Sequence, residues 1–239
     1  SNDETLTVIE NIVSGDLRFK IYSLEKHMSL SLARNYALSH VNGTFFCFLD
    51  SDDIYSEHRI SNVMANINSM EDQDVFITNG YEDRNSNLKE FYKTKPELND
   101  LLLNYKVYLC AVVFSHRIKE KLNFSDQFNL VEEYYAIVRL VKLYAVSVSY
   151  LNVFDVYWTV HSNSLTWRQL DGWSDEYLLM DSKLKEEGLL SEKEHSYLVK
   201  KAFIFSLFKN RKNYSKVDDV YKSMPLNLKI LKFFRGVLG

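Results

Sequence analysis

Apolar positions follow a helical spacing in some stretches of the chain and form short strand-like runs in others. Helical spacing predicts helices over residues 3–13, 57–69, 176–187, 191–209 and 217–234, and one more that carries Ala33, Ala37 and Val41 and ends near Gly43. Short apolar runs predict strands over residues 19–24, 44–49, 75–78 and 105–115. The alternation up to Trp158 predicts an α/β sheet with crossover helices, followed by a helical C-terminal third.

The composition is that of a folded protein, with 46% apolar and 14% aromatic residues among 239. We expect an α/β domain over residues 1–168 and a basic helical region over residues 169–239. Cys47 and Cys110 each lie within an apolar run, which predicts reduced, buried thiols rather than a disulfide or metal ligands. Neither a long apolar span nor a leader segment is visible, so we expect a cytoplasmic protein.

Charge is distributed unevenly along the chain. The net charge is −3, but the residues from Val199 onward hold ten Lys or Arg against Asp218 and Asp219, which leaves −11 for the residues before them. The segment 225–235 is basic and amphipathic. It would either lie on the anionic inner face of the cytoplasmic membrane or pack on the rest of the protein. We expect no nucleic-acid partner.

The clearest candidate site is the acidic run Asp50-Ser51-Asp52-Asp53, which follows the apolar strand 44–49. Open α/β sheets bind ligands at the carboxyl ends of their strands. Three carboxylates in four residues repel one another unless a cation offsets them, and oxygen ligands suit Mg²⁺ or Mn²⁺. The alternative is a solvated acidic turn that caps the next helix.

The surroundings of this run resemble the family 2 glycosyltransferases of the GT-A fold. The resemblance rests on Leu32-Ala33-Arg34-Asn35-Tyr36-Ala37-Leu38, then Gly43, then the segment from Phe48 to Tyr55. It implies a Rossmann-like nucleotide-diphospho-sugar transferase domain with a C-terminal helical appendage. It also implies that Asp50 faces the donor ribose, that Asp52 holds the metal on the diphosphate, that Asp53 assists, and that Arg34 lies near the nucleotide. The alternative for Arg34 is a surface salt bridge.

Two later segments extend the resemblance. Phe124-Ser125-Asp126-Gln127-Phe128 followed by Glu132-Glu133 is similar to a loop and acidic pair that open a helix in the family. The resemblance places Glu132 at the donor and makes Glu133 the general base, although the family carries Asp there. The third segment, from Val156 to Thr166, includes His161, which would approach the metal. The alternatives are acids that favour a helix dipole and a structural histidine.

The resemblance implies a function in which a nucleotide-diphosphate sugar donates its sugar, with inversion, to a glycan or lipid-linked acceptor of a bacterial surface polysaccharide. A divalent metal, Mn²⁺ or Mg²⁺, would be the cofactor. The chain starts within the family pattern, so we expect the first strands of the family's N-terminal region to be missing. The rival hypotheses are a degenerate glycosyltransferase-like binding module and a haloacid-dehalogenase-like phosphatase.

Overall fold

The computed structural model describes residues 3–67, 70, 72–84, 86–97, 107–161 and 172–206. Its helices are α1 (Thr5–Ile12), α2 (Leu30–Ser39), α3 (Arg59–Ile67), α5 (Glu132–Tyr144), α7 (Trp173–Glu186) and α8 (Glu192–Ser206), with 3-10 turns η1 (Leu109–Ala111) and η2 (His116–Lys121). Its strands are β1 (Phe45–Cys47), β2 (Ile54–Tyr55), β3 (Val75–Arg84), β4 (Asn87–Glu90), β5 (Val112–Ser115) and β6 (Val148–Thr159).

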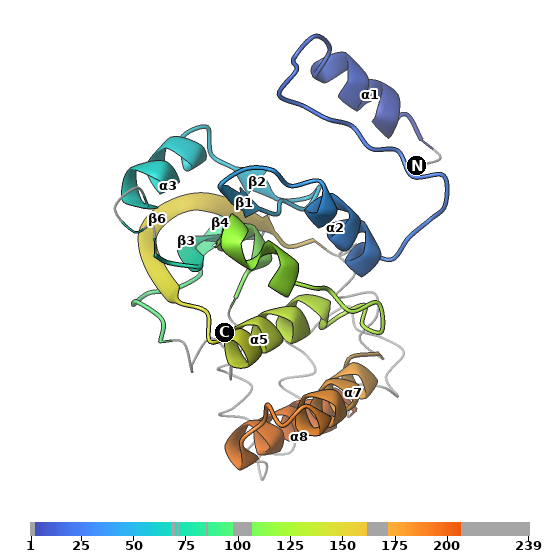
Figure 1. The fold of residues 1–239 in the computed structure, drawn as a ribbon, viewed down its shortest axis with the longest axis vertical. Coiled ribbons are helices and arrows are strands. Elements are labelled where there is room, and N and C mark those ends of the chain that lie inside the picture. Colours follow the sequence, from blue (N-terminus) through green and yellow to red (C-terminus); the bar gives the residue numbers. More distant parts are fainter. Residues whose placement is uncertain are drawn as a thin grey trace.

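The strands of the described residues form one mixed, six-stranded sheet in the order β1-β5-β3-β6-β2, with β4 paired to β3. Only β3 and β6 run parallel. Strands β1 and β2 stand at opposite ends of this order, yet only residues 48–53 join them in the chain, and six residues span at most about 20 Å. The strongly curved β6 in Figure 1 shows that the sheet curls, and the acidic run connects its two end strands.

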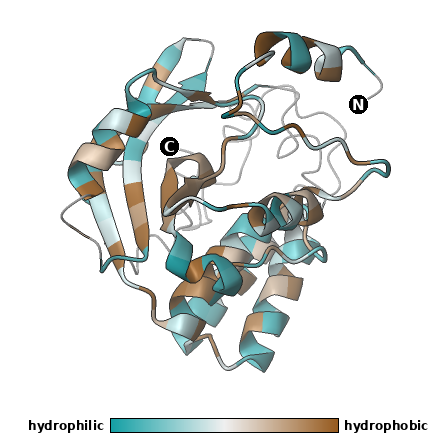
Figure 2. Ribbon diagram, turned by 45° about the horizontal axis from the view of Figure 1, so that its top comes forward, coloured by the Kyte–Doolittle hydropathy of each residue, from teal (hydrophilic) through white to brown (hydrophobic). Residues whose placement is uncertain are grey.

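The alternation of side chains along the strands builds a core on each face of the sheet. Phe76 and Val113 point to the face that α3 covers, where they pack with Val63 and Ile67. Their neighbours, such as Ile77, Val112 and Phe114, belong to the larger cluster on the other face, which contains the apolar sides of α5, α7 and α8. Figure 2 shows the apolar sides of the lower helices turned toward one another. The C-terminal helices thus share a core with the sheet.

Several sequence predictions are confirmed within a few residues. The helices at α1, α2, α3, α7 and α8, and the start of α5 at Glu132, lie where they were expected. Ser29 begins α2 by accepting the backbone N–H of Leu32, and Gly188, with φ +69°, lies in the turn between α7 and α8. Cys47 and Cys110 are free thiols; Cys110 is buried as predicted, whereas Cys47 is only partly buried. The predicted helix over 217–234 and the basic segment 225–235 lie outside the described residues.

The strand predicted over residues 19–24 is wrong, because these residues form an extended segment without a strand partner in the described sheet. Phe19 remains 56% exposed, and Tyr22 packs its ring on α2 and its C-cap, 5.8 Å from the ring of Tyr36 and 4.3 Å from that of His40. An apolar run becomes a strand only where a neighbour supplies hydrogen bonds. In Figure 1 this segment and α1, which has no buried residue, stand apart from the sheet.

The three other strand predictions are correct in place but wrong in extent. The strand expected over 75–78 is the beginning of the longer β3, Val75–Arg84. The strand expected over 44–49 covers only Phe45–Cys47 at the end of the sheet, where Phe46 is its one fully buried residue. The strand expected over 105–115 is replaced in part by η1, so β5 keeps only Val112–Ser115. Within the described part of the chain, no helix has both the length and the apolar character needed to cross a bilayer.

Candidate functional site

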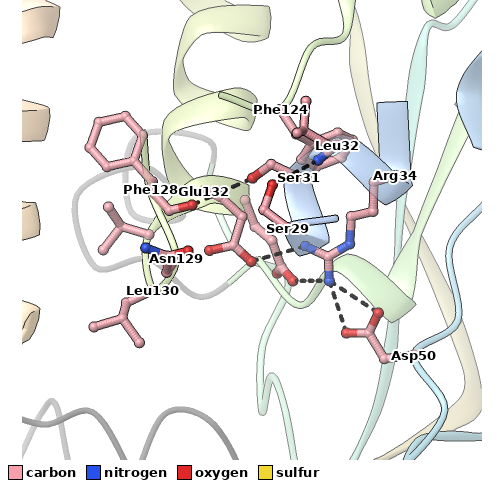
Figure 3. A network of polar contacts seen from close by, with 12 residues as sticks. Ser29, Ser31, Leu32, Arg34, Asp50, Phe124, Phe128, Asn129, Leu130 and Glu132 are labelled. Carbon is pink, nitrogen blue, oxygen red and sulfur yellow. Dashed lines mark hydrogen bonds and ion pairs between the residues drawn. The ribbon is translucent and has the colours of Figure 1, made fainter. Parts of the chain in front are cut away.

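Arg34 is the centre of the site, because its guanidinium contacts three carboxylates from two distant parts of the chain. Its Nη1 donates to Glu132 (3.0 Å), and its Nη2 lies 2.9 Å from Asp50 and 2.7 Å from Glu133. Figure 3 shows the guanidinium between Asp50 and the acidic start of α5. The helix α2 thereby connects the acidic run to the acidic pair, although 98 positions separate Arg34 from Glu132.

Burial makes this contact electrostatically strong. The Arg34 side chain is 5% exposed, and although burial alone would lower its pKa, the nearby Glu133, Asp50 and Glu132 raise that pKa above its ordinary value. Arg34 therefore stays charged. The surface salt bridge considered from the sequence is excluded for Arg34, since its contacts are buried and involve three partners.

The two acids of α5 differ in their surroundings. The Glu132 side chain is 7% exposed, and burial together with the adjacent Glu133 raises the pKa of Glu132 to about 7, although Arg34 acts in the opposite direction. Glu133 is 22% exposed and shares Nη2 of Arg34 with Asp50. Glu133 is thus the member of the pair that a bound molecule can reach more easily.

The loop before α5 is held against α2. Asn35 donates its amide to the carbonyl of Phe124 (2.7 Å) and accepts the backbone N–H of Phe124 (2.9 Å). The hydroxyl of Ser31 lies 3.5 Å from the carbonyl of Phe128, at the far end of that loop. The segment 124–128, similar to a family signature, is therefore fixed by the same helix that carries Arg34.

The acidic run is a tight turn and does not cap a helix. The N–H of Asp53 donates to the carbonyl of Asp50 (3.1 Å), and the next helix, α3, begins only at Arg59. The Tyr55 hydroxyl lies within hydrogen-bond distance of the carbonyl of Phe48 (2.8 Å) and that of Cys110 (2.9 Å), which fixes the turn on η1. The helix-capping alternative for the run is therefore wrong.

The three aspartates of the run have different partners. Asp50 faces Arg34, whereas Asp53 accepts the backbone N–H of Thr159 in β6 (3.0 Å). Burial raises the pKa of Asp53 to about 6 against that hydrogen bond, and the charges of Asp50 and Asp52 add to the increase. Asp52 is 46% exposed and lies 3.2 Å from Nε2 of His161. The structure thus brings together every residue that the sequence proposed for the site.

Cys110 lies beside these acids, which the sequence did not indicate. Burial and the charge of Asp53, with smaller effects of Glu133 and Asp50, raise the pKa of the Cys110 thiol well above its usual value. It remains a neutral thiol under the acidic turn. Its place in an apolar run predicted burial correctly, but only the curl of the sheet brings η1 next to residues 50–53.

The site offers a divalent cation one exposed carboxylate and one imidazole, those of Asp52 and His161. Among the described residues, no three side chains of His, Cys, Asp or Glu converge to hold a metal without other ligands. Both groups lie on the exposed side of the turn. Mg²⁺ in nucleotide sites usually takes one or two carboxylates and completes its shell with phosphates and water, so this pair fits a metal shared with a diphosphate.

Comparisons with known proteins agree with this geometry. Residues 1–125 match the family model described as Glycosyl transferase family 2. The Escherichia coli UDP-Glc:alpha-D-GlcNAc-diphosphoundecaprenol beta-1,3-glucosyltransferase WfaP is 29% identical over 169 residues, which are 70% of this chain and 64% of that protein. An uncharacterized glycosyltransferase of Haemophilus influenzae is 29% identical over 80 residues, 34% of this chain and 31% of that protein. The chain therefore spans less than two thirds of either relative.

Solved structures show the same fold at low sequence identity. The crystal structure of S. aureus TarS 1–349 superposes with a TM-score of 0.60 at 20% identity and covers 93% of this chain and 65% of that one. The complex of TarS 1–349 with UDP-GlcNAc gives a TM-score of 0.61 at 18% identity, covering 99% of this chain and 70% of that one. The GT-A fold expected from the sequence is confirmed.

Proposed function

The chain belongs to glycosyl transferase family 2, and from this premise we propose that it transfers a sugar from a UDP-sugar to a hydroxyl of a lipid-linked glycan acceptor, with inversion. The observation that carries the proposal is the convergence of Asp50, Glu132 and Glu133 on Arg34. It places an acidic turn suited to a metal-bound diphosphate next to a partly exposed carboxylate, that of Glu133, suited to a general base. The haloacid-dehalogenase hypothesis is excluded by the family assignment.

In the proposed reaction, Asp50 and Asp52 position the donor from the acidic turn, and Arg34 keeps Asp50 in place. Asp52, with His161, would hold Mn²⁺ or Mg²⁺, which supplies positive charge to the diphosphate leaving group. Glu133 accepts the proton of the acceptor hydroxyl as its oxygen bonds to the anomeric carbon and the bond from that carbon to the diphosphate breaks. Attack from the face opposite the diphosphate inverts the anomeric configuration.

The acid pair supports the choice of Glu133 over Glu132 as the base. Glu132 is almost fully buried, and its pKa of about 7 leaves much of it protonated near neutral pH. Glu133 has three times the exposed fraction of Glu132, 22% against 7%, and one of its oxygens is 2.7 Å from Arg34. We assign Glu132 to the donor side as a second carboxyl group, positioned through Arg34.

The substrates and ligands named for two similar proteins support a proposal for the substrate class. WfaP is described as acting on UDP-Glc and a GlcNAc-diphosphoundecaprenol, and a TarS structure holds UDP-GlcNAc. We propose the same chemical classes for this chain: a UDP-hexose donor and a lipid-diphosphate acceptor at the inner face of the cytoplasmic membrane, in the synthesis of a surface polysaccharide. The transfer chemistry is assigned to residues 1–168, and contact with the membrane to the basic end of residues 169–239.

The test is transfer from UDP-glucose or UDP-GlcNAc to a short-chain GlcNAc-diphospholipid in the presence of Mn²⁺, with UDP release and the anomeric configuration of the product as readouts. Glu133→Gln should lower turnover by ~10²–10⁴-fold with little change in donor affinity, because it removes general-base catalysis. Asp52→Asn should weaken donor binding in Mn²⁺ more than in its absence. Donor binding without UDP release in the unmodified chain would instead favour the degenerate binding module, and a Glu133→Gln variant with full turnover would exclude Glu133 as the base.

A further inference from the structure

The carboxylate of Glu176 in the first turn of α7 binds the loop that leads into the acid pair. Its Oε1 accepts the backbone N–H of Asn129 (2.9 Å), and its Oε2 accepts those of Leu130 (2.8 Å) and Val131 (3.1 Å). Three consecutive amides therefore converge on one side chain from a different helix. Successive backbone N–H groups that point to one spot form a strong anion-binding arrangement.

These contacts hold the backbone just before α5: the N–H of Val131 belongs to the helix start, and those of Asn129 and Leu130 lie in the loop that precedes it. Val131 is the N-cap residue of α5, and no side-chain cap bond is made there because the valine side chain cannot accept a hydrogen bond. The amides that precede the helix would otherwise need water or a local acceptor. Glu176 satisfies them from 45 to 47 positions further along the chain and adds a negative charge at the positive end of the α5 dipole.

The position of this contact relative to the site gives it a consequence for catalysis. Val131 directly precedes Glu132 and Glu133, so the acid pair is fixed from two sides: Arg34 holds the carboxylates, and Glu176 holds the backbone that carries them. Figure 3 shows Asn129 and Leu130 on the side of Glu132 away from Arg34. A backbone shift at Val131 would move Glu133 relative to Arg34 and to Asp50.

We propose that Glu176 is a positioning residue for glycosyl transfer, through which α7 sets the place of the base Glu133. The inference rests on the proposed function, because it takes Glu133 as the base. It adds that the helical region after the sheet is required for the geometry of the reaction, and not only for the stability of the domain. A misplacement of a catalytic group by about 1 Å can cost about 100-fold in rate.

The experiment compares Glu176→Gln with a matched control, Glu187→Gln, in the full chain. Glu187 also joins the end of α7 to α5, where it accepts hydrogen bonds from the Tyr135 hydroxyl (2.8 Å) and Arg139 Nε (2.7 Å), but it contacts no part of the loop 129–131. Both variants weaken the packing of α7 on α5, so an effect on packing alone is common to both. Only Glu176→Gln removes the negative charge and one of the two acceptor oxygens that hold the amides before the acid pair.

Turnover and KM are measured with UDP-glucose, Mn²⁺ and the GlcNAc-diphospholipid, and the fraction of competent protein is fixed by titration with UDP. We expect Glu176→Gln to lower kcat per competent site by about 10–100-fold with KM for UDP-glucose unchanged, because the acidic turn is untouched. Glu187→Gln should keep kcat within about two-fold, the scale of a surface substitution. Hydrogen exchange at Asn129, Leu130 and Val131 should accelerate in Glu176→Gln only.

Glu176→Asp provides a second variant, since it keeps the charge but shortens the side chain by one methylene. It should restore part of kcat and part of the protection of the three amides. Equal kcat in Glu176→Gln and Glu187→Gln, with Glu133→Gln still slowed, would overturn the inference and leave the proposed function in place. Full turnover in Glu133→Gln would instead mark a failure of the proposed function itself.

Discussion

Replacement of Arg34 by Met tests the central contact of the site, because it removes the charge and keeps a side chain of similar length. The guanidinium is 5% exposed and lies 2.7–3.0 Å from carboxylate oxygens of Glu133, Asp50 and Glu132. Unit charges about 3 Å apart attract by roughly 5 kcal/mol at an effective dielectric constant of 20, but desolvation offsets most of this gain. Removal of one partner from a buried pair leaves the other charge uncompensated and costs about 3–5 kcal/mol. We expect that loss for Arg34→Met at pH 8.

The pH dependence of this loss follows from the acids that remain. Without Arg34 the folded-state pKa of Glu132 rises further above its unfolded value, so the folded protein binds more protons than the unfolded chain, and stability falls as pH increases. Acidification from pH 8 to pH 5.5 should therefore restore about 1.4 kcal/mol of the stability lost in Arg34→Met for each unit by which the pKa of Glu132 rises. The native protein should not show this extra recovery, since Arg34 lowers the pKa of Glu132.

The assay is urea unfolding at pH 5.5 and pH 8, with the midpoint converted to a free energy at constant m. Arg139→Met is the matched control, because Arg139 forms one ion pair with Glu187 (2.7 Å) at a position 27% exposed, and such pairs contribute about 0–1 kcal/mol. Arg34→Lys keeps the charge but cannot span Asp50 and Glu132 with one ammonium group, so an intermediate loss is expected. If Arg34→Met lost no more stability than Arg139→Met, or lost the same amount at both pH values, the role assigned to the buried Arg34 charge would be refuted.

Two further predictions concern buried ionisable groups. The pKa of Glu132 is raised from 4.5 to about 7, so the stability that protonated Glu132 contributes is lost progressively as the pH rises between those values. Glu132→Gln should remove this loss and flatten the profile of stability against pH by up to about 3 kcal/mol. An unchanged slope in urea titrations would contradict this expectation. Lys201 in α8 is 5% exposed, and burial lowers its pKa to about 8. Its ammonium group lies 5.5 Å from the ring centroid of Tyr177 and 5.2 Å from that of Tyr197, and it has no ion pair among the described residues. Lys201→Met should therefore raise stability by about 1–3 kcal/mol below pH 8, with the gain fading toward pH 10.5, where the unfolded lysine also loses its proton; a variant less stable than the parent at pH 7 would refute this.

Local signals in the sequence predicted α1, α2, α3, α7 and α8 to within a few residues, whereas the start of α5 was implied by the family resemblance. The start of α5 coincides with the acid pair Glu132-Glu133, and α2 begins after Ser29, whose hydroxyl caps it, because these features act over three or four residues. Strands were less predictable. Residues 19–24 have the apolar pattern of a strand, but a strand also needs a neighbour to pair with, and a local pattern does not say where that neighbour lies.

The members of the candidate site could be named from the resemblance, but their contacts could not. Arg34 was placed near a nucleotide, whereas its three partners are carboxylates, one of them 99 positions away. Glu176 carried no signal beyond an acid in the first turn of a helix, which is common for dipole reasons alone. Both contacts depend on how α2, α5 and α7 pack, and a single sequence contains no direct record of that packing.

The contacts divide the acids of the site into those already neutralised and those left for a ligand. Asp50, Glu132 and Glu133 share Arg34, and Asp53 is held by the N–H of Thr159 in β6. Asp52 has the imidazole of His161 as its ion-pair contact and keeps 46% of its side chain exposed. The site thus holds five carboxyl groups, of which three contact its one guanidinium, and the surplus of negative charge is most accessible at Asp52. A cation that binds there offsets this repulsion, so Asp52→Asn should reduce the gain in thermal stability that Mn²⁺ and UDP produce together far more than the gain from UDP alone.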